Sequence, residues 1–234
     1  MSGGALGRAL LGLLALALVG AGCRPASAPV STEQREVAPP LEPVQVVYVE
    51  KTAALLPYWA ANDDGAFARN GLGVALQQVP DAQTAYTSLA GAAAQVYLTP
   101  LDATLVARAA NGADLAILGG PQSLAIVTTR PLLANREVIL ERFLRGVLEG
   151  IHTVETQPDT ARALLDREGL SAAGSPAVDL ERVPYLSADD LAPALVAAAS
   201  TDSRAAALDP AKLLDQTLLH RLDASGFVAA LYRG

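Results

Sequence analysis

The sequence is poor in cysteine, lysine and aromatic residues. Cys23 is its only cysteine, so no disulfide can form within the chain. Only two lysines, Lys51 and Lys212, occur in 234 residues, and the formal net charge is −7. Nucleic-acid binding is therefore disfavoured, because phosphates are neutralised by clustered Lys and Arg. Aromatic residues make up 4% of a chain that is 51% hydrophobic. Each aromatic side chain is therefore a more informative candidate for a contact with a ligand.

Catalytic and metal-binding motifs are also missing from the sequence. The two histidines, His152 and His220, each fall on an expected helix without a partner motif. There is no metal-ligand spacing, no nucleophile elbow and no phosphate-binding glycine loop. We expect solvated or packed histidines, no cofactor, no metal and no enzyme.

The N-terminus has the pattern of an export signal. Arg8 precedes an uncharged stretch, residues 9–22, which is shorter than the ~20 apolar residues that span a bilayer and is typical of a signal-peptide core. The following Val19-Gly-Ala-Gly-Cys23 resembles the lipobox of bacterial lipoproteins, although Gly20 stands where a larger aliphatic residue is usual. This resemblance implies a signal peptide over residues 1–22 and lipidation of Cys23. An ordinary secretory signal with an incidental cysteine is the alternative.

A proline-rich segment follows the cysteine. Residues 23–43 have little apolar content and cannot bury enough surface to fold. We interpret this segment as a disordered linker that holds the folded part several nanometres from a membrane, at ~3 Å per residue.

From Val44 to Gly120, strand-like and helical segments alternate. The expected strands are residues 44–50, 74–79, 95–99 and 113–118, and the expected helices are residues 56–70, 81–94 and 102–111. This order predicts βαβ units on a parallel-type sheet with flanking helices, an α/β fold over residues 44–130. Open α/β sheets bind ligands outside the carboxyl ends of their strands, so we expect a binding site at that edge.

Three passages in this run resemble one family. They are Pro57-Tyr-Trp59 with Gly65-Ala-Phe67 and Asn70-Gly-Leu72, then residues 86–99, then residues 107–118. In this order they resemble the substrate-binding proteins of ABC transporters of the sulfonate, nitrate and thiamine-precursor type. The resemblance implies a periplasmic-binding-protein type II fold, a small-molecule ligand and the permease subunits of an ABC importer as partners.

The candidate ligand-binding residues lie at the strand-to-helix turns of the carboxyl edge. Helix N-termini there offer free backbone N–H groups to a polar ligand atom. The candidates are Lys51, Thr52, Tyr58, Trp59, Asp81, Gln83, Thr84, Thr99, Pro100, Asp102 and Gly120.

Several of these candidates have a structural alternative. Asp81 and Asp102 are also plausible N-caps, which would occupy the same N–H groups, and Trp59 could pack in the core. Two carboxylates at the site weaken the case for a sulfate-like anion. Tyr58 and Trp59 could stack on a flat ring, which favours a small organic ligand such as a heterocycle.

The second half of the chain departs from the family. In the family, the chain builds a second lobe after the fourth strand and then returns through a strand and long helices. In this sequence, residues 121–150 already resemble the returning segment. Most of the second lobe is therefore expected to be absent, with residues 131–234 forming helices that pack on the first lobe. We expect helices near residues 188–199 and 210–222, and a loop over residues 171–183.

Two functions fit these observations. The first is a solute-binding component of an ABC importer, lipid-anchored to a bacterial membrane in the cell envelope and facing the extracytoplasmic side. The second is a degenerate single-lobe relative that acts as an interaction or sensory lipoprotein without transport. One lobe alone should bind ligand more weakly than a two-lobe clamp.

Overall fold

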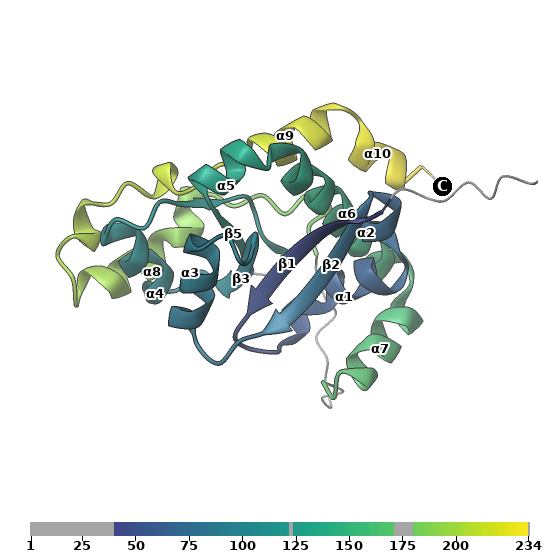
Figure 1. The fold of residues 1–234 in the computed structure, drawn as a ribbon, viewed down its shortest axis with the longest axis horizontal. Helices are drawn as coiled ribbons and strands as arrows, with labels where there is room; N and C mark the ends of the chain where they lie inside the picture. The colour runs from purple at the N-terminus through teal and green to yellow at the C-terminus, as the bar shows by residue number, and fades with distance from the viewer. Residues whose placement is uncertain (1–39, 122–123, 171–179, 234) are drawn as a thin grey trace, which may run out of the picture. The chain divides into compact units, whose positions relative to one another are not determined.

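A five-stranded sheet with the strand order β2-β1-β3-β5-β4 forms the centre of the fold (Figure 1). The structure is a computed structural model and describes residues 40–121, 124–170 and 180–233. The strands are β1 (Glu42–Tyr48), β2 (Leu72–Gln78), β3 (Val96–Pro100), β4 (Leu115–Ile117) and β5 (Leu124–Thr129).

Four strands run parallel and one runs against them. β1 pairs in parallel with both β2 and β3, while β5 pairs antiparallel with β3 on one side and β4 on the other. The four strands expected between Val44 and Gly120 are confirmed and share one direction. The sheet as a whole is mixed rather than purely parallel, because β5 is inserted between the third and fourth strands.

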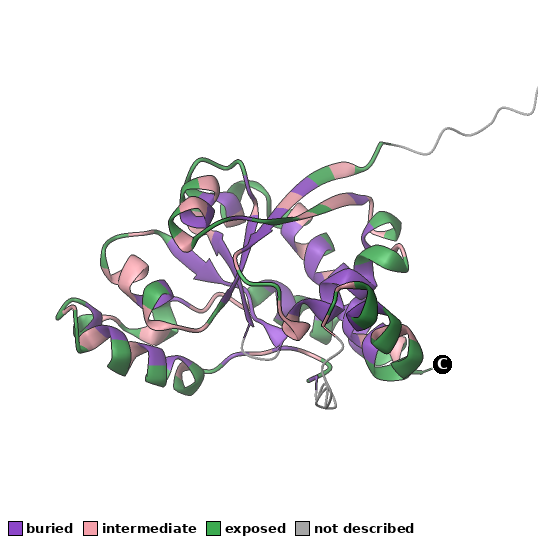
Figure 2. Cartoon of the chain, turned by 90° about the horizontal axis from the view of Figure 1, so that it is seen from below, coloured by how far each residue is buried: buried purple, intermediate pink, exposed green. Residues whose placement is uncertain are grey.

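Alternation along the strands creates a core on each face of the sheet. Val46 and Leu98 point into one core and Val47 and Tyr97 into the other, as the two-residue period of a strand requires. Figure 2 shows the strands buried between helices whose outer faces are exposed. The central strands are thus covered on both sides, which their near-continuous apolar sequences predict.

Helices from both halves of the chain cover the two faces. The first core contains buried residues of α1, α2, α6, α7, α9 and α10, and the second contains those of α3, α4, α5 and α8. The bounds of these helices are α1 (Leu56–Asp63), α2 (Ala66–Arg69), α3 (Ala82–Ala90), α4 (Ala103–Ala110), α5 (Arg130–Asn135), α6 (Glu137–Thr156), α7 (Pro158–Arg167), α8 (Ala188–Ala199), α9 (Thr217–Ala224) and α10 (Phe227–Leu231).

The helix expected over residues 210–222 is wrong in its first half. A short 3-10 turn, Pro210–Lys212, is followed by an extended segment beside β4. Ile117 N–H donates to the Leu213 carbonyl at 2.8 Å, and Asp215 N–H donates to the Ile117 carbonyl at 2.9 Å. β4 is the edge strand, and its free backbone groups need partners, so the extended pairing replaces the helix that the leucine spacing predicts.

Close packing of α6 on α1 and α2 holds the first face together. Gly150 lies so near α1 that an added Cβ would meet the Pro57 carbonyl oxygen at 2.1 Å, and one on Gly146 would meet the Phe67 ring at 2.5 Å. Phe143 of α6 stacks on Phe67 with ring centroids 5.3 Å apart. The two glycines let the helix backbones approach, and the aromatic rings fill the space beside them.

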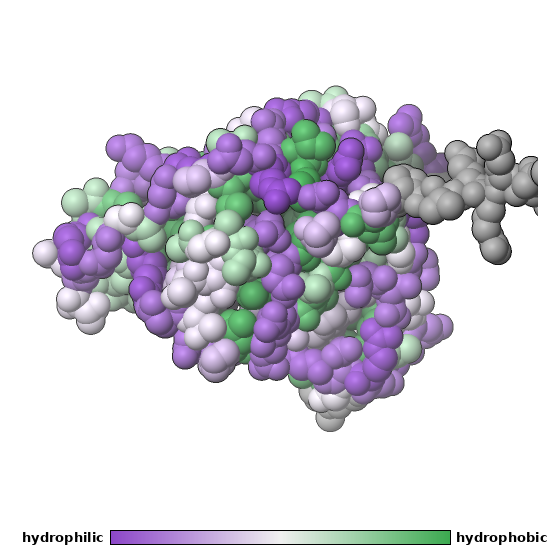
Figure 3. All heavy atoms as spheres, viewed as in Figure 1, coloured by the Kyte–Doolittle hydropathy of each residue, from purple (hydrophilic) through white to green (hydrophobic). Residues whose placement is uncertain are grey.

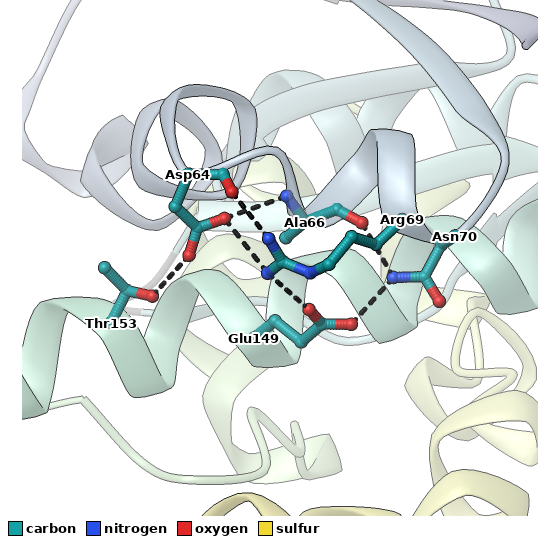
Figure 4. A network of polar contacts seen from close by, with 6 residues as sticks. All are labelled: Asp64, Ala66, Arg69, Asn70, Glu149 and Thr153. Atoms are coloured by element: carbon teal, nitrogen blue, oxygen red, sulfur yellow. Dashed lines mark hydrogen bonds and ion pairs between the residues drawn. The ribbon is translucent and has the colours of Figure 1, made fainter.

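A polar network fastens the turn between α1 and α2 to α6 (Figure 4). Gly65 adopts a left-handed conformation with φ +76° and divides the single helix expected over residues 56–70. Asp64 accepts from the Ala66 N–H at 2.8 Å and from the Thr153 hydroxyl at 2.7 Å. Arg69 pairs with Glu149 at 2.8 Å, so both sides of the glycine turn are bonded to the same helix.

The connection between β4 and β5 consists of residues 118–123. The resemblance places a second α/β lobe at this point, and so short a connection cannot contain one. Gly120 N–H donates to the Pro184 carbonyl at 3.0 Å, and the described residues contain one sheet.

The predictions for the N-terminus lie outside the described residues. These are the signal peptide, the lipidation of Cys23 and nearly all of the linker; most of the loop expected at 171–183 is also outside. In the part of the chain that the structure describes, no helix is both long and apolar enough to cross a membrane.

We predict that Gly150→Ala destabilises the protein by about 1–3 kcal/mol, because overpacking a core forces backbone shifts. Thermal denaturation followed by circular dichroism measures the change. Gly73→Ala is the matched control, since a Cβ at Gly73 would meet Leu41 Cβ at an ordinary 3.5 Å. Equal melting temperatures for the wild type and Gly150→Ala would contradict the packing described here.

Candidate ligand site at the carboxyl edge of the sheet

A pocket lies at the carboxyl edge of the sheet, where the chain leaves β1 and β3. Its volume is about 180 Å³. Four of the predicted binding residues line it together: Thr52, Thr99, Pro100 and Asp102. The structure adds Val49, Glu50, Ala82, Tyr97, Leu98 and Leu124. The pocket thus lies at the edge where the strand order places it, between the N-termini of α3 and α4.

Carboxylates surround the phenol of Tyr97 in this pocket. Burial raises the pKa of Tyr97, and the negative charges of Asp102, Asp81 and Glu50 raise it further, while a hydrogen bond with Thr99 opposes them. The phenol is therefore protonated at neutral pH. No lysine or arginine is among the described residues that line the pocket. Its electrostatics favour cationic or neutral ligands and disfavour anions.

The two aspartates of the predicted site are helix caps. Asp81 accepts from the Thr84 N–H at 2.7 Å and Asp102 from the Leu105 N–H at 2.9 Å, which is the capping alternative that the sequence left open. Hydrogen bonds from the backbone and side chain of Thr84 lower the pKa of Asp81. Because each cap uses one carboxylate oxygen in these bonds, the other oxygen of Asp102 stays available at the pocket.

The aromatic pair expected to stack on a ligand belongs to the core instead. Tyr58 is fully buried and stacks on Phe143 at 6.4 Å, and burial raises its pKa. Trp59 is 6% exposed and lies among core residues. Neither residue lines the pocket, so these two rings provide no support for a heterocyclic ligand. The two side chains start a helix whose inner face is held by α6, and both fall on buried positions.

Lys51 is committed to another part of the chain. Its ammonium pairs with Glu168 at 2.6 Å and lies 6.0 Å from the centre of the Trp59 ring. The pairing lowers the pKa of Glu168. Lys51 therefore links the end of β1 to the end of α7 and brings no positive charge into the pocket lining.

Gln83, Thr84 and Gly120 also lie outside the pocket lining. Gln83 bonds to Arg108 and to Thr87 on the outer surface of α3, and Thr84 contributes its backbone to the cap. Gly120 is buried, and a Cβ there would meet the Leu124 carbonyl oxygen at 2.1 Å. We correct the expectation that Gly120 presents a free N–H to a ligand, because that N–H is bonded to Pro184.

Sequence reasoning missed Glu50 and Tyr97. Glu50 was the last residue of an expected strand, and the polar residue directly after an apolar strand was a usable signal. Tyr97 lies inside β3, where its hydroxyl reaches the edge only because of the length of its side chain. No local pattern distinguishes such a tyrosine from a core residue.

The histidines pack against aromatic rings, as expected for helix positions without a catalytic partner. His152 meets Tyr232 edge-on at 4.7 Å and His220 stacks on Tyr185 at 4.6 Å. Over residues 40–121, 124–170 and 180–233, no three His, Cys, Asp or Glu side chains form a group that could hold a metal ion.

Known proteins resemble this chain in structure but not in sequence. No protein-family model matches it, and a search of curated proteins finds no match. A conserved gene product of Candida albicans, which defines a family with the generic periplasmic binding protein structural fold, matches with a TM-score of 0.57 and 13% identity over 79% of this chain and 95% of that one. A protein of Bordetella bronchiseptica RB50 matches with a TM-score of 0.58 and 14% identity over 79% and 98%.

This chain has the generic periplasmic binding protein fold. At identities of 13% and 14% the likeness concerns the fold alone, and the sulfonate, nitrate and thiamine-precursor type stays a prediction. The strand order of this fold agrees with a pocket at the carboxyl edge of the sheet.

We predict that the Asp81 cap makes the folding stability of the protein depend on pH. Because folding lowers the pKa of this carboxyl, its contribution is fully present above the unfolded value of about 3.9 and is lost as the pH falls through the folded value. Asn also caps helices but does not titrate. The urea midpoint of the wild type minus that of Asp81→Asn should therefore be larger at pH 6 than at pH 3.

Asp81→Ala serves as the control for this cap, because it loses the hydrogen bond at every pH. Its urea midpoint should lie below those of both other proteins at pH 6. If the urea midpoints of the wild type and Asp81→Asn differ by the same amount at both pH values, the charge of the carboxylate does not contribute to the stability of α3.

Proposed function

We propose that this protein is a solute-binding component of an ABC importer that binds a small neutral or cationic organic molecule at the carboxyl-edge pocket. The ligand is delivered to permease subunits. The protein works on the extracytoplasmic side of a bacterial membrane, to which a lipid on Cys23 anchors it. It has no catalytic activity of its own.

The charge of the pocket lining carries this proposal. Glu50 and Asp102 line the pocket, and the pKa of Tyr97 reports the proximity of Asp81 as well. A desolvated ammonium or amide N–H would satisfy these oxygens, because hydrogen bonds to charged groups are the stronger ones. A sulfonate or nitrate would instead be repelled, so the ligand class of this chain differs from that of the anion-binding proteins it resembles.

The size of the pocket supports a small ligand or one wall of a larger site. Its volume of about 180 Å³ is below the ~300–1,000 Å³ of typical ligand pockets. A second lobe would supply the opposite wall and exclude water, and residues 118–123 cannot contain one. We therefore expect modest affinity.

The same short connection favours a second candidate function. A lobe that cannot close on its ligand could instead act as an interaction or sensory lipoprotein. The two functions differ in transport: loss of the gene should abolish uptake of the bound ligand in the first case and leave uptake unchanged in the second.

Calorimetric titration tests the binding proposal. We predict saturable binding of at least one member of a panel of small amines and neutral polar metabolites, and none of sulfonates. For a cationic ligand, Glu50→Gln with Asp102→Asn should weaken binding about ten-fold for each charge removed, since ~1.4 kcal/mol corresponds to a factor of ten. The Asn keeps the helix cap.

Asp159→Asn is the matched control, because Asp159 has a side chain that is 95% exposed on α7 and is not part of the pocket. Its affinity for the ligand should equal that of the wild type. Absence of heat with every amine and neutral metabolite, or a preference for anions, would overturn the proposal.

A further inference from the structure

A broad hollow lies at the opposite edge of the sheet from the ligand pocket. Its volume is about 540 Å³. The residues after α2 and the outer face of α6 line it, and those that the argument uses are Arg69, Gly71, Val138, Arg142 and Arg145. Gly71 immediately precedes β2, so the hollow lies at the amino ends of the parallel strands.

The hollow has an excess of positive charge on an acidic protein. The excess is counted over the lining, which has three arginines and one glutamate. Arg69 pairs with two carboxylates outside the lining, Glu149 at 2.8 Å and Asp64 at 3.3 Å (Figure 4), and contributes no free positive charge. Glu141, which also lines the hollow, is paired with Arg221 at 2.8 Å. Arg142 and Arg145 are the two cations that remain.

Neither remaining arginine is paired with a carboxylate in the described chain. Arg142 is exposed, and the Arg145 guanidinium lies 4.6 Å from the centre of the Phe227 ring. The formal net charge of the whole chain is −7, so two unpaired guanidinium groups in one hollow stand out against the rest of the molecule.

Exposed apolar side chains accompany these cations. Val138 lines the hollow and is 62% exposed, and Leu41, packed beside Gly73 at the start of β2, is 47% exposed. One view of the molecule shows small apolar patches between bands of hydrophilic residues (Figure 3). Cations next to exposed apolar side chains are typical of surfaces that rest on a membrane interface.

The N-terminal segment enters the fold beside this hollow. Glu42 N–H donates to the Gly71 carbonyl at 2.9 Å, and Glu42 pairs in register with Leu72. Residues 24–39 separate Cys23 from the described chain and span at most about 58 Å when extended. A lipid on Cys23 would therefore attach the protein to the bilayer through this edge of the sheet.

We propose that this hollow is a docking surface for a bilayer with anionic phospholipid headgroups, and that Arg142 and Arg145 make the electrostatic contact. The proposal rests on the membrane anchoring in the proposed function. A bilayer fits better than a free oxyanion, because the surface combines cations with exposed apolar groups. It fits better than a second copy, because the proposed tether attaches the chain to a membrane at this edge.

Vesicle co-sedimentation tests the proposal. The full chain with Cys23→Ser, which carries no lipid, is mixed with phosphatidylcholine vesicles with or without phosphatidylglycerol. Any binding by the N-terminal apolar segment contributes to both measurements. The partition coefficient should be larger with phosphatidylglycerol, and Arg142→Gln with Arg145→Gln should reduce that preference about thirty-fold, since each arginine near an anionic surface contributes ~1 kcal/mol.

Arg162→Gln with Arg204→Gln is the matched control, because it removes two exposed arginines elsewhere on the molecule. The control should keep the preference for anionic vesicles. Both double variants should melt like the parent protein and bind the pocket ligand equally, which separates failure of docking from failure of ligand binding.

Three outcomes would overturn the proposal. They are equal partitioning into both kinds of vesicle, an equal loss in the control variant, and retention of the preference after removal of Arg142 and Arg145. A dimer in solution that the Arg142/Arg145 variant dissociates would assign the hollow to a second copy. Binding of inorganic phosphate without a vesicle preference would assign it to a free oxyanion.

Discussion

The contact between α6 and α1 determines where the ligand pocket can be. Gly150 brings the two helix backbones together at Pro57, and the Phe143 ring fills the neighbouring space against Phe67. Because α1 is held in this way, the short turn from β1 into α1 has a fixed course, and Glu50 and Thr52 on that turn line the pocket. A core contact between helices far apart in the sequence thus positions residues that face solvent.

The pattern of apolar residues predicted the elements better than it predicted their partners. Short apolar segments that alternate with helical ones identified the strands β1 to β4, and capping chemistry identified Asp81 and Asp102. Pairing across the sheet is a non-local property. β5 is inserted beside β3, and a bridge between Leu214 and Ile117 replaces a helix. Both follow from hydrogen bonds between segments that no local window contains.

The same distinction explains the outcome for the candidate site. Thr52, Thr99, Pro100 and Asp102 follow strand ends, and the rule that parallel strands end at one edge was enough to bring them together. The prediction for Tyr58 and Trp59 depended on which face of α1 is buried, and the packing of α6 on α1 determines that face. The place of Tyr97 in the pocket depends on the length of its buried side chain, which extends from the interior of β3 to the edge.

Charge is separated across the sheet, and the separation constrains how the protein can work. β1 and β2 have seven residues each, so the acidic pocket and the basic hollow are about 20 Å or more apart. This exceeds the ~8 Å screening length at physiological salt, and the two surfaces act on their partners independently.

A protein docked through the hollow holds its pocket away from the bilayer, where it can collect ligand. In the proposed function, delivery to a permease would require undocking. Contacts made by two arginines would be weak enough to break, while the proposed lipid on Cys23 would keep the protein at the membrane. The proposed tether would also raise the local concentration of the protein near a permease, which would offset the modest affinity expected of a single lobe.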